Sequence, residues 1–458
     1  MGRATVQCIN INTPLCPLEI TTKYTQQPPS LPPPPPSTSH YPPPSYEDYK
    51  ATETGYLRGS LSGLLLFAVA CTILSRMYRP AGYQTPPMIP YEGEHRWTFR
   101  APRELTFRQE QLPNPQLTVK GHVRVRSYDP RDGGDEGVVI DVKMRMSHRD
   151  VESMIEIRAV RDGVIIKTKP QRSWSTLSCL NIAATISIPL SNPHIESTGI
   201  YTETLGITVE PNCDLVTPLL ELKTAAGDIT LDEAFGVEAW KAKASAVSGS
   251  ISGDFALFES VELYAASGAI KTTLFPQQHG GGTTSYKATT ISGNIETSFP
   301  DTNPPEGHYE TEVNTTAGRI TGQYLLGHAL SLKTTSGSIT STIVPTNARN
   351  AQLRTVSTQG NTELRFKRGL GAGRWGLFAK HEAISGNINV KYPTDFEGAL
   401  TASTVAGRIA IGGAEVDAVA SGWPITKRVD GTKGAGREGR GGTVEAVGTS
   451  GGIQLWVG

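Results

Sequence analysis

The stretch TTSGSITS, Thr334 to Ser341, is one of three closely similar segments in this chain of 458 residues. TISGNIET occupies Thr290 to Thr297, and AISGNINV occupies Ala383 to Val390. Each segment has a small residue before a glycine and an isoleucine two residues after that glycine. Alignment on this glycine reveals ten copies of the pattern, at Gly227, Gly249, Gly268, Gly293, Gly318, Gly337, Gly360, Gly386, Gly407 and Gly451.

The spacing of these glycines indicates a repeat. Successive glycines lie 19 to 26 residues apart, except for a last interval of 44 residues, which is twice 22. A nearly constant period in this range is typical of stacked repeat architectures. One degenerate unit is therefore expected between Gly407 and Gly451. The copy at Gly360, where Thr362 replaces isoleucine, is expected to distort its coil.

Apolar and polar residues alternate on both sides of each glycine. Ile339 and Ile343 follow Gly337, for example, and Leu332 and Thr334 precede it. Alternation with a period of two puts one face of a strand inward. Each unit is therefore predicted to be a strand, a tight corner and a second strand. The glycine is expected to supply unusual backbone torsions or close packing at the corner.

Two all-β architectures can use such a unit. In a β-solenoid each period forms one coil and equivalent isoleucines stack, whereas in a sandwich the units form antiparallel hairpins. We favour the β-solenoid, with stacked coils of about 22 residues, because independent hairpins need no common period. Ile339 is then expected to be buried between neighbouring coils, and Ser338 is expected to face outward.

The recurring Thr-x-(Ser/Ala)-Gly-x-Ile motif resembles the putative-adhesin repeat domains of uncharacterised bacterial proteins. It also resembles fungal membrane proteins that combine such a domain with a proline-rich tail and one membrane span. The resemblance covers Gly199 to Gly458 well and Leu105 to Pro211 loosely. It implies the β-solenoid fold and an adhesin-like label, and it says almost nothing about activity.

Strand patterns and turns also occur outside the repeats. Residues 99–218 alternate in hydropathy and contain a hairpin turn at Asp162-Gly163, so they are predicted to be a β-rich capping section. The solenoid itself is predicted at 219–458, where the chain stops inside its last strand, QLWVG, so no capping section is expected at the C-terminal end. The glycine-rich stretch 421–442 is predicted to be a flexible loop, with phosphate or glycan binding as the alternative.

The N-terminal region differs in composition from the rest. Residues 28–44 contain ten prolines, so residues 1–56 are expected to form a disordered tail. The uncharged run Gly59 to Ser75 then predicts one transmembrane helix within 57–78. A linker at 79–98 is expected to join this helix to the β-rich part of a single-pass membrane protein.

Two short motifs bear on orientation and partners. Pro43, Pro44 and Tyr46 belong to a PPSY sequence, which matches the PPxY ligand that WW domains bind as a polyproline II segment. The downstream part contains an N-glycosylation sequon at Asn314. Both features indicate a cytosolic N-terminus and a solenoid outside the cytosol, at the cell surface or a secretory or vacuolar membrane. A WW-domain protein, such as a ubiquitin ligase, is the expected tail partner, and the outer ligand is unknown.

Charge and cysteine content exclude several other classes. The chain has 43 basic and 43 acidic residues, so its balance gives no electrostatic argument for nucleic-acid binding. No CxxC pair and no paired histidine spacing occurs, so neither a metal nor a cofactor is expected. Cys179 and Cys213 could form a disulfide in an oxidising compartment or could be two buried thiols.

Two motif matches to hydrolases are misleading. Gly448 to Gly452 reads GTSGG and His279 to Gly282 reads HGGG, but a nucleophile elbow needs an acid and a histidine later in the chain. Neither follows Ser450, and of the ten residues directly after the motif glycines only Asp228 is acidic. We therefore expect a non-enzymatic binding or structural module. The alternatives are a polysaccharide-active β-helix enzyme, or a membrane adaptor or cargo of a WW-domain ubiquitin ligase.

Overall fold

The computed structural model describes residues 88–458, apart from positions 94, 101, 112–116, 133–135, 170–177, 233–235, 278–281, 301–303, 306, 347–349, 368–375, 424–425 and 435–440. All described residues belong to one compact unit, Thr85–Gly458. The predicted tail, the predicted membrane segment, and Pro43, Pro44 and Tyr46 of the PPSY sequence lie outside the described residues.

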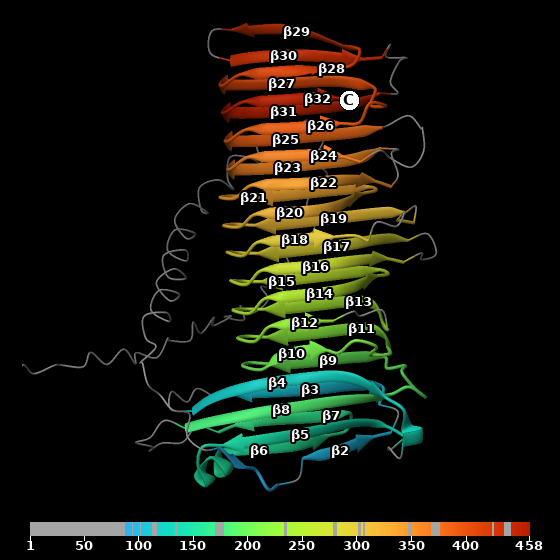
Figure 1. Cartoon of the computed structure of the whole chain (residues 1–458), viewed down its shortest axis with the longest axis vertical. Helices are drawn as coiled ribbons and strands as arrows, with labels where there is room; N and C mark the ends of the chain where they lie inside the picture. Colours follow the sequence, from blue (N-terminus) through green and yellow to red (C-terminus); the bar gives the residue numbers. More distant parts are fainter. Residues whose placement is uncertain are drawn as a thin grey trace, which may run out of the picture. The chain divides into compact units, whose positions relative to one another are not determined.

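The described residues form two sixteen-stranded sheets, which we call sheet A and sheet B (Figure 1). Sheet A contains β1 (Ile89–Pro90), β2 (Arg96–Phe99), β4 (Leu117–Tyr128), β5 (Val138–Met146), β8 (Ser178–Pro189), β10 (Gly206–Val209), β12 (Ile229–Leu231), β14 (Ile251–Leu257), β16 (Ile270–Pro276), β18 (Ile295–Ser298), β20 (Ile320–Leu326), β22 (Ile339–Pro345), β24 (Thr362–Phe366), β26 (Ile388–Tyr392), β28 (Ile409–Gly413) and β32 (Ile453–Val457). Sheet B contains β3 (Glu104–Gln111), β6 (Ile155–Val160), β7 (Gly163–Thr168), β9 (Ser197–Thr202), β11 (Leu215–Thr224), β13 (Val237–Ala246), β15 (Ser260–Ala265), β17 (Thr283–Thr290), β19 (His308–Thr315), β21 (Ala329–Thr334), β23 (Ala351–Gln359), β25 (Leu377–Ser385), β27 (Gly398–Ala406), β29 (Val416–Trp423), β30 (Thr426–Lys433) and β31 (Gly442–Ser450). Two short 3-10 helices, Pro130–Asp132 and Arg149–Met154, complete the described elements.

Each repeat contributes one strand to sheet B and the next strand to sheet A. Equivalent strands of successive repeats pair in parallel: β21 lies between β19 and β23, and β22 lies between β20 and β24. Independent hairpins would pair antiparallel within each repeat. The parallel register is therefore that of stacked coils, and the sandwich alternative is wrong.

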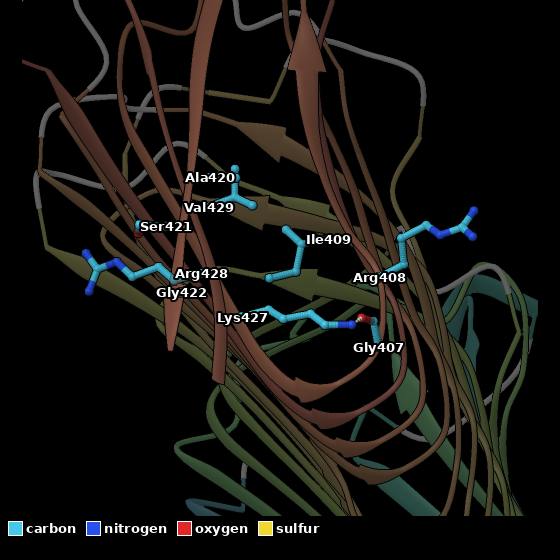
Figure 2. Close-up of a pocket in the computed structure, with 9 residues that line it drawn as sticks. All are labelled: Gly407, Arg408, Ile409, Ala420, Ser421, Gly422, Lys427, Arg428 and Val429. Atoms are coloured by element: carbon cyan, nitrogen blue, oxygen red, sulfur yellow. Dashed lines mark hydrogen bonds between the residues drawn. The ribbon is translucent and has the colours of Figure 1, made fainter. Parts of the chain in front are cut away.

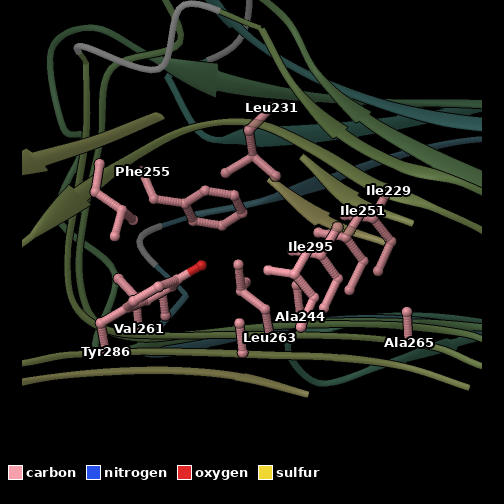
Figure 3. Packing of buried hydrophobic residues seen from close by; sticks show 14 of the residues in the cluster. Ile229, Leu231, Ala244, Ile251, Phe255, Val261, Leu263, Ala265, Tyr286 and Ile295 are labelled. Atoms are coloured by element: carbon pink, nitrogen blue, oxygen red, sulfur yellow. The ribbon is translucent and has the colours of Figure 1, made fainter. Parts of the chain in front are cut away.

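The motif isoleucines form a column along the stack, in which Thr362 takes one position and only Ile409, in the last coil, is partly exposed. Ile320 pairs with Ile339, and Ile339 is completely buried, as predicted. Figure 3 shows Ile229, Ile251 and Ile295 following one another, opposite smaller side chains of sheet B such as Ala244. Small residues suit these facing positions because the two sheets enclose a narrow core. Each residue of the column is the first of its strand, so the residue two positions later also points into the core.

The motif glycines are required mainly because successive corners touch. A Cβ atom added to Gly249 would lie 1.7 Å from the carbonyl oxygen of Gly227, and one added to Gly337 would lie 1.8 Å from that of Gly318. Such distances leave no room for a side chain. Gly360 also has φ of +144°, which L side chains rarely adopt, but most motif glycines have ordinary torsions. Of the two expected reasons for glycine, close packing therefore dominates.

Inward threonines three residues before the glycine complete the corner. Thr290 Oγ1 accepts a hydrogen bond from the Gly293 amide at 3.0 Å and donates one to the Gly268 carbonyl of the neighbouring coil at 3.2 Å. Thr315 and Thr334 donate to the preceding glycine carbonyl in the same way, both at 3.1 Å. These hydroxyls satisfy buried corner groups that a purely apolar residue would leave unpaired.

The strand order at both ends departs from the chain order. In sheet A, β32 lies between β26 and β28, and in sheet B, β31 lies between β25 and β27. The last strands of the chain thus form the next-to-last coil of the stack. Likewise β3 lies between β7 and β9. The interval between Gly407 and Gly451 holds no degenerate coil: it holds the antiparallel pair β29 and β30.

Antiparallel strands cover the ends of the stack. At the N-terminal end, β5 pairs with β8 and β6 pairs with β7, both antiparallel. At the other end, β30 pairs antiparallel with β27. An uncovered sheet edge would invite pairing with other chains. The expectation that the C-terminal end has no cover is therefore wrong for sheet B, whereas sheet A ends at β28.

The predicted fold class needs correction in one respect, because it included a transmembrane helix. No helix among the described residues is long or apolar enough to span a bilayer. The apolar run on which the prediction rested, Gly59 to Ser75, lies outside those residues.

Two further predictions concern residues that the structure does describe. Residues 421–423 are the end of β29 and Thr426–Lys433 form β30, so much of the predicted flexible loop at 421–442 is a strand pair. Cys179 and Cys213 are both free thiols. Cys179 pairs with Thr118 at the start of β4, whereas the Asp214 amide beside Cys213 bonds Ser127 near its other end. Nine extended residues, about 30 Å, separate these positions, so the cysteines cannot form a disulfide.

Candidate functional site

The outer face of sheet B carries alternating charges. Glu221, Lys243, Glu262, Lys287 and Glu312 lie in register on five successive strands. Lys243 Nζ lies 3.3 Å from a Glu262 carboxylate oxygen, and Lys287 Nζ lies 3.3 Å from one of Glu312. Neighbouring strands are about 4.8 Å apart, which suits such pairs. Glu262 and Glu312 are therefore neutralised across coils.

The pKa shifts agree with this pairing. A hydrogen bond from the Asn314 amide, together with Lys287, lowers the pKa of Glu312. Burial alone would raise the pKa of Glu382, but bonds from Lys380 and Arg354 lower it overall. Within the described part of the chain, every carboxyl group with a shifted pKa is shifted downward. A glycosidase acid needs the opposite shift.

Polar residues directly after the motif glycines hold neighbouring coils together. Asn294 Oδ1 accepts a hydrogen bond from the Arg319 amide at 2.9 Å, and Asn387 Oδ1 accepts one from the Gly452 amide at 2.7 Å. Asp228, the one acidic residue at these positions, accepts a bond from the Ser250 amide at 2.7 Å. This outward column is thus used in the stack, and it does not form a cluster of free acids.

An open pocket of about 740 Å³ lies at the C-terminal end, between β28 and the β29–β30 pair (Figure 2). Its lining includes Arg408, Lys427 and Arg428, so it could attract an anion. Lys427 Nζ, however, donates a hydrogen bond to the Gly407 carbonyl at 2.9 Å, and Arg428 binds Asp430 at 2.9 Å. Figure 2 shows Arg408 and Arg428 extending away to opposite sides. Two of the three cations are therefore already engaged.

One titratable network is enclosed within the coils. His381 Nδ1 lies 2.8 Å from Thr355 Oγ1, and His381 Nε2 lies 2.7 Å from the Tyr392 hydroxyl. Burial lowers the pKa of His381 to about 4. A neutral imidazole with both nitrogens bonded, and with no exposed surface, has no access to a substrate. We interpret this network as part of the core.

The remaining predicted site residues lie apart from one another. Asn314 belongs to β19, where its amide nitrogen, the atom that would carry a glycan, donates to Glu312 at 2.8 Å. Ser450 ends a strand that leads into another strand, and its hydroxyl donates to the Ile384 carbonyl at 3.2 Å. It therefore lacks the strand-to-helix turn of a nucleophile elbow. Across the described ranges, no group of three or more potential ligands is placed to hold a metal ion.

Exposed aromatic side chains are a feature that the repeat pattern did not reveal. Trp240, Tyr264 and Phe378 lie on strands of sheet B, and Trp456 lies on β32 of sheet A. Trp456 is 46% exposed. The alternation in QLWVG already placed this side chain on the outer face, since Leu455 and Val457 take the inward positions. The sequence did not show which strands lie beside it.

Comparisons with known proteins give only distant similarities. No protein-family model and no curated protein matches the chain. It is similar to a solved putative adhesin from Bacteroides fragilis, at 12% identity and a TM-score of 0.30, covering 62% of this chain and 100% of the other. A putative adhesin from Parabacteroides distasonis gives 7% identity and a TM-score of 0.25, covering 81% and 97%. A putative cell adhesion protein from Clostridium sporogenes gives 9% identity and a TM-score of 0.14, covering 81% and 100%.

Proposed function

We propose that this chain is a non-enzymatic binding or structural module, in which the solenoid presents flat polar faces to a macromolecular ligand. The observation that carries this proposal is the cross-coil pairing on sheet B, where Lys243 neutralises Glu262 and Lys287 neutralises Glu312. Polysaccharide-active enzymes commonly use two carboxyl groups, one of them with a raised pKa. The paired and lowered carboxyls of this face favour recognition over catalysis.

Incubation with soluble polysaccharides tests this proposal. We expect the purified chain to be retarded by at least one polysaccharide in affinity electrophoresis, without any increase in reducing ends. Release of reducing ends above a heat-denatured control would contradict the proposal and support the polysaccharide-active alternative. Glu312→Gln and Glu382→Gln should then identify the acid, because both carboxyls lie on the face in question.

For the tail we propose a WW-domain partner, supported by the PPSY sequence that contains Pro43, Pro44 and Tyr46. A WW groove takes a polyproline II segment between aromatic rings, with tyrosine completing the contact. A peptide covering His40 to Lys50 should bind a WW domain of the PPxY-binding class, and Tyr46→Ala should abolish the binding. Binding that survives Tyr46→Ala would be generic affinity for proline. It would contradict the proposed WW-domain partner, and with it the alternative that the chain is an adaptor or cargo of a WW-domain ubiquitin ligase.

A location outside the cytosol is a separate proposal, supported by the sequon at Asn314. Its test is a mobility shift on treatment with peptide N-glycosidase that disappears in Asn314→Gln. Because the Asn314 amide donates to Glu312, a glycan on this nitrogen would have to displace that bond. A chain from its native cell that shows no shift would contradict the use of this sequon.

A further inference from the structure

The last four strands in the order of sheet A present an ordered grid of side chains on their outer face. Two rows cross β24, β26, β32 and β28 in register. The first row is Glu363, Asn389, Gln454 and Ala410, and the second is Arg365, Lys391, Trp456 and Gly412. Leu364, Val390 and Leu455 alternate with them and are buried, so the two rows face outward.

Trp456 lies over a gap in this grid. A Cβ atom added to Gly412 would lie 2.9 Å from Cζ3 of the indole and 3.3 Å from Cε3. The six-membered ring of Trp456 therefore occupies the space that any side chain at position 412 would take. The ring is held beside the sheet and still leaves almost half of the residue's surface in solvent.

Three polar neighbours of Trp456 are uncommitted, in contrast to the paired charges of sheet B. In the part of the chain that the structure describes, the amides of Asn389 and Gln454 and the ammonium of Lys391 make no side-chain hydrogen bond or ion pair. Glu363 is already engaged, because Arg365 donates to it at 2.8 Å. A hollow of about 340 Å³, lined by residues that include Asn389 and Lys391, lies alongside.

This combination matches the chemistry of a sugar ring. A pyranose with equatorial hydroxyls has an apolar C–H face that stacks on an aromatic ring, and its hydroxyls both donate and accept hydrogen bonds. Amide side chains offer donors and an acceptor together, and lysine adds three donors. Nucleic acid fits poorly, because only one uncommitted cation stands among these residues, and phosphate contacts dominate such binding. An apolar ligand fits poorly because four of the five residues that line the hollow, Asn389 and Lys391 among them, are polar or charged.

We propose that this surface, formed by Asn389, Lys391, Gln454 and Trp456, binds an extended β-linked glycan, with Trp456 as the stacking platform. The proposal rests on the proposed function, since it names a ligand for a binding module. The amides bind hydroxyls of neighbouring sugar units along the row. Lys391 binds either a hydroxyl of a neutral sugar or the carboxylate of an acidic one. Both kinds of sugar present the same pyranose ring, with an apolar face and equatorial hydroxyls.

The test is titration of the full chain with cellohexaose and with a β-1,4-linked hexaglucuronate, followed by calorimetry and by saturation-transfer NMR. We expect at least one to bind and Trp456→Ala to weaken its binding by about tenfold or more. Because Trp456→Ala removes the cover of Gly412, the double variant Asn389→Ala with Gln454→Ala serves as a second probe that keeps the ring. Phe378→Ala is the matched control, since Phe378 is similarly exposed on the opposite sheet.

Each outcome decides a different point. If Lys391→Ala weakens binding of hexaglucuronate only, the ligand is an acidic glycan, and if it weakens binding of cellohexaose as much, the ligand is neutral. Binding that survives both Trp456→Ala and the double variant overturns this site while leaving a binding module in place. Binding of neither oligosaccharide overturns the glycan proposal. Release of reducing ends from either one would instead overturn the proposed function itself.

Discussion

Gly407 stacks on Gly451, although the strands β28, β29, β30 and β31 separate the two glycines in the chain. A Cβ atom on Gly407 would lie 1.9 Å from the Gly451 carbonyl oxygen, and one on Gly451 would lie 2.2 Å from that of Gly386. The glycine column is therefore continuous through a coil that the chain inserts last. Ile453 continues the isoleucine column in the same way, between Ile388 and Ile409. Motif identity, more than position in the chain, determines where a coil can stack.

The first prediction separates close packing from backbone torsion at the corners. Gly249→Ala should lower the free energy of unfolding by about 2 kcal/mol or more, because its methyl group would meet the Gly227 carbonyl at 1.7 Å. Gly249 has an ordinary φ, so torsional strain cannot be the cause. Chemical denaturation followed by circular dichroism measures the change.

Gly206→Ala is the matched control for that variant. Its added methyl group would meet nothing closer than a carbonyl oxygen at 3.4 Å, an ordinary contact. We expect a change within about 0.5 kcal/mol. Equal losses for both variants would show that the corner glycines are needed for something other than the stacking contact.

A second prediction concerns the inside and outside of one coil. Ile339→Asp should lower the free energy of unfolding by about 3–5 kcal/mol, because it buries an unpaired charge between Ile320 and Thr362. Ser338→Asp, one residue earlier and facing outward, should be nearly neutral. Amide hydrogen exchange should show lost protection in β20 and β24 for Ile339→Asp alone. Similar protection in both variants would contradict the assignment of the two faces.

The third prediction uses two threonines in different positions. Thr362 replaces isoleucine in the buried column, and its hydroxyl has no hydrogen-bond partner. Thr362→Val should therefore raise the free energy of unfolding by about 1 kcal/mol. Thr290→Val should lower it by about 1–3 kcal/mol, since the Thr290 hydroxyl bonds both Gly293 and Gly268. Thermal unfolding of both variants checks the opposite signs, and a loss at Thr362 would contradict the reasoning.

The local unit could be predicted from the sequence because its determinants are local. The alternation around Ile339 gives the strand phase, and the small residue before Gly337 gives the corner. The strand order at the ends could not be predicted, because Ile409 and Ile453 have the same motif and either could stack on Ile388. That choice depends on where β29 and β30 pair, which is a contact distant in the chain. The Trp456 surface was hidden for the same reason, since Gly412 is far from it in sequence.

The last prediction concerns pH and His381. In the unfolded chain its pKa is about 6.5, and burial lowers it in the folded chain to about 4. The unfolded state therefore binds the proton more readily, so stability is complete above pH 6.5 and is lost as the pH falls toward 4. One pKa unit corresponds to about 1.4 kcal/mol, so the loss over this range should approach about 3 kcal/mol.

Denaturation at a series of pH values should show this slope in the parent chain. His381→Gln, which keeps a polar group near Thr355 and Tyr392 but does not titrate, should flatten the slope between pH 6.5 and 5. Lower pH is less informative, because paired carboxylates such as Glu312 then begin to take up protons as well. An unchanged slope in His381→Gln would show that the buried imidazole does not control acid stability.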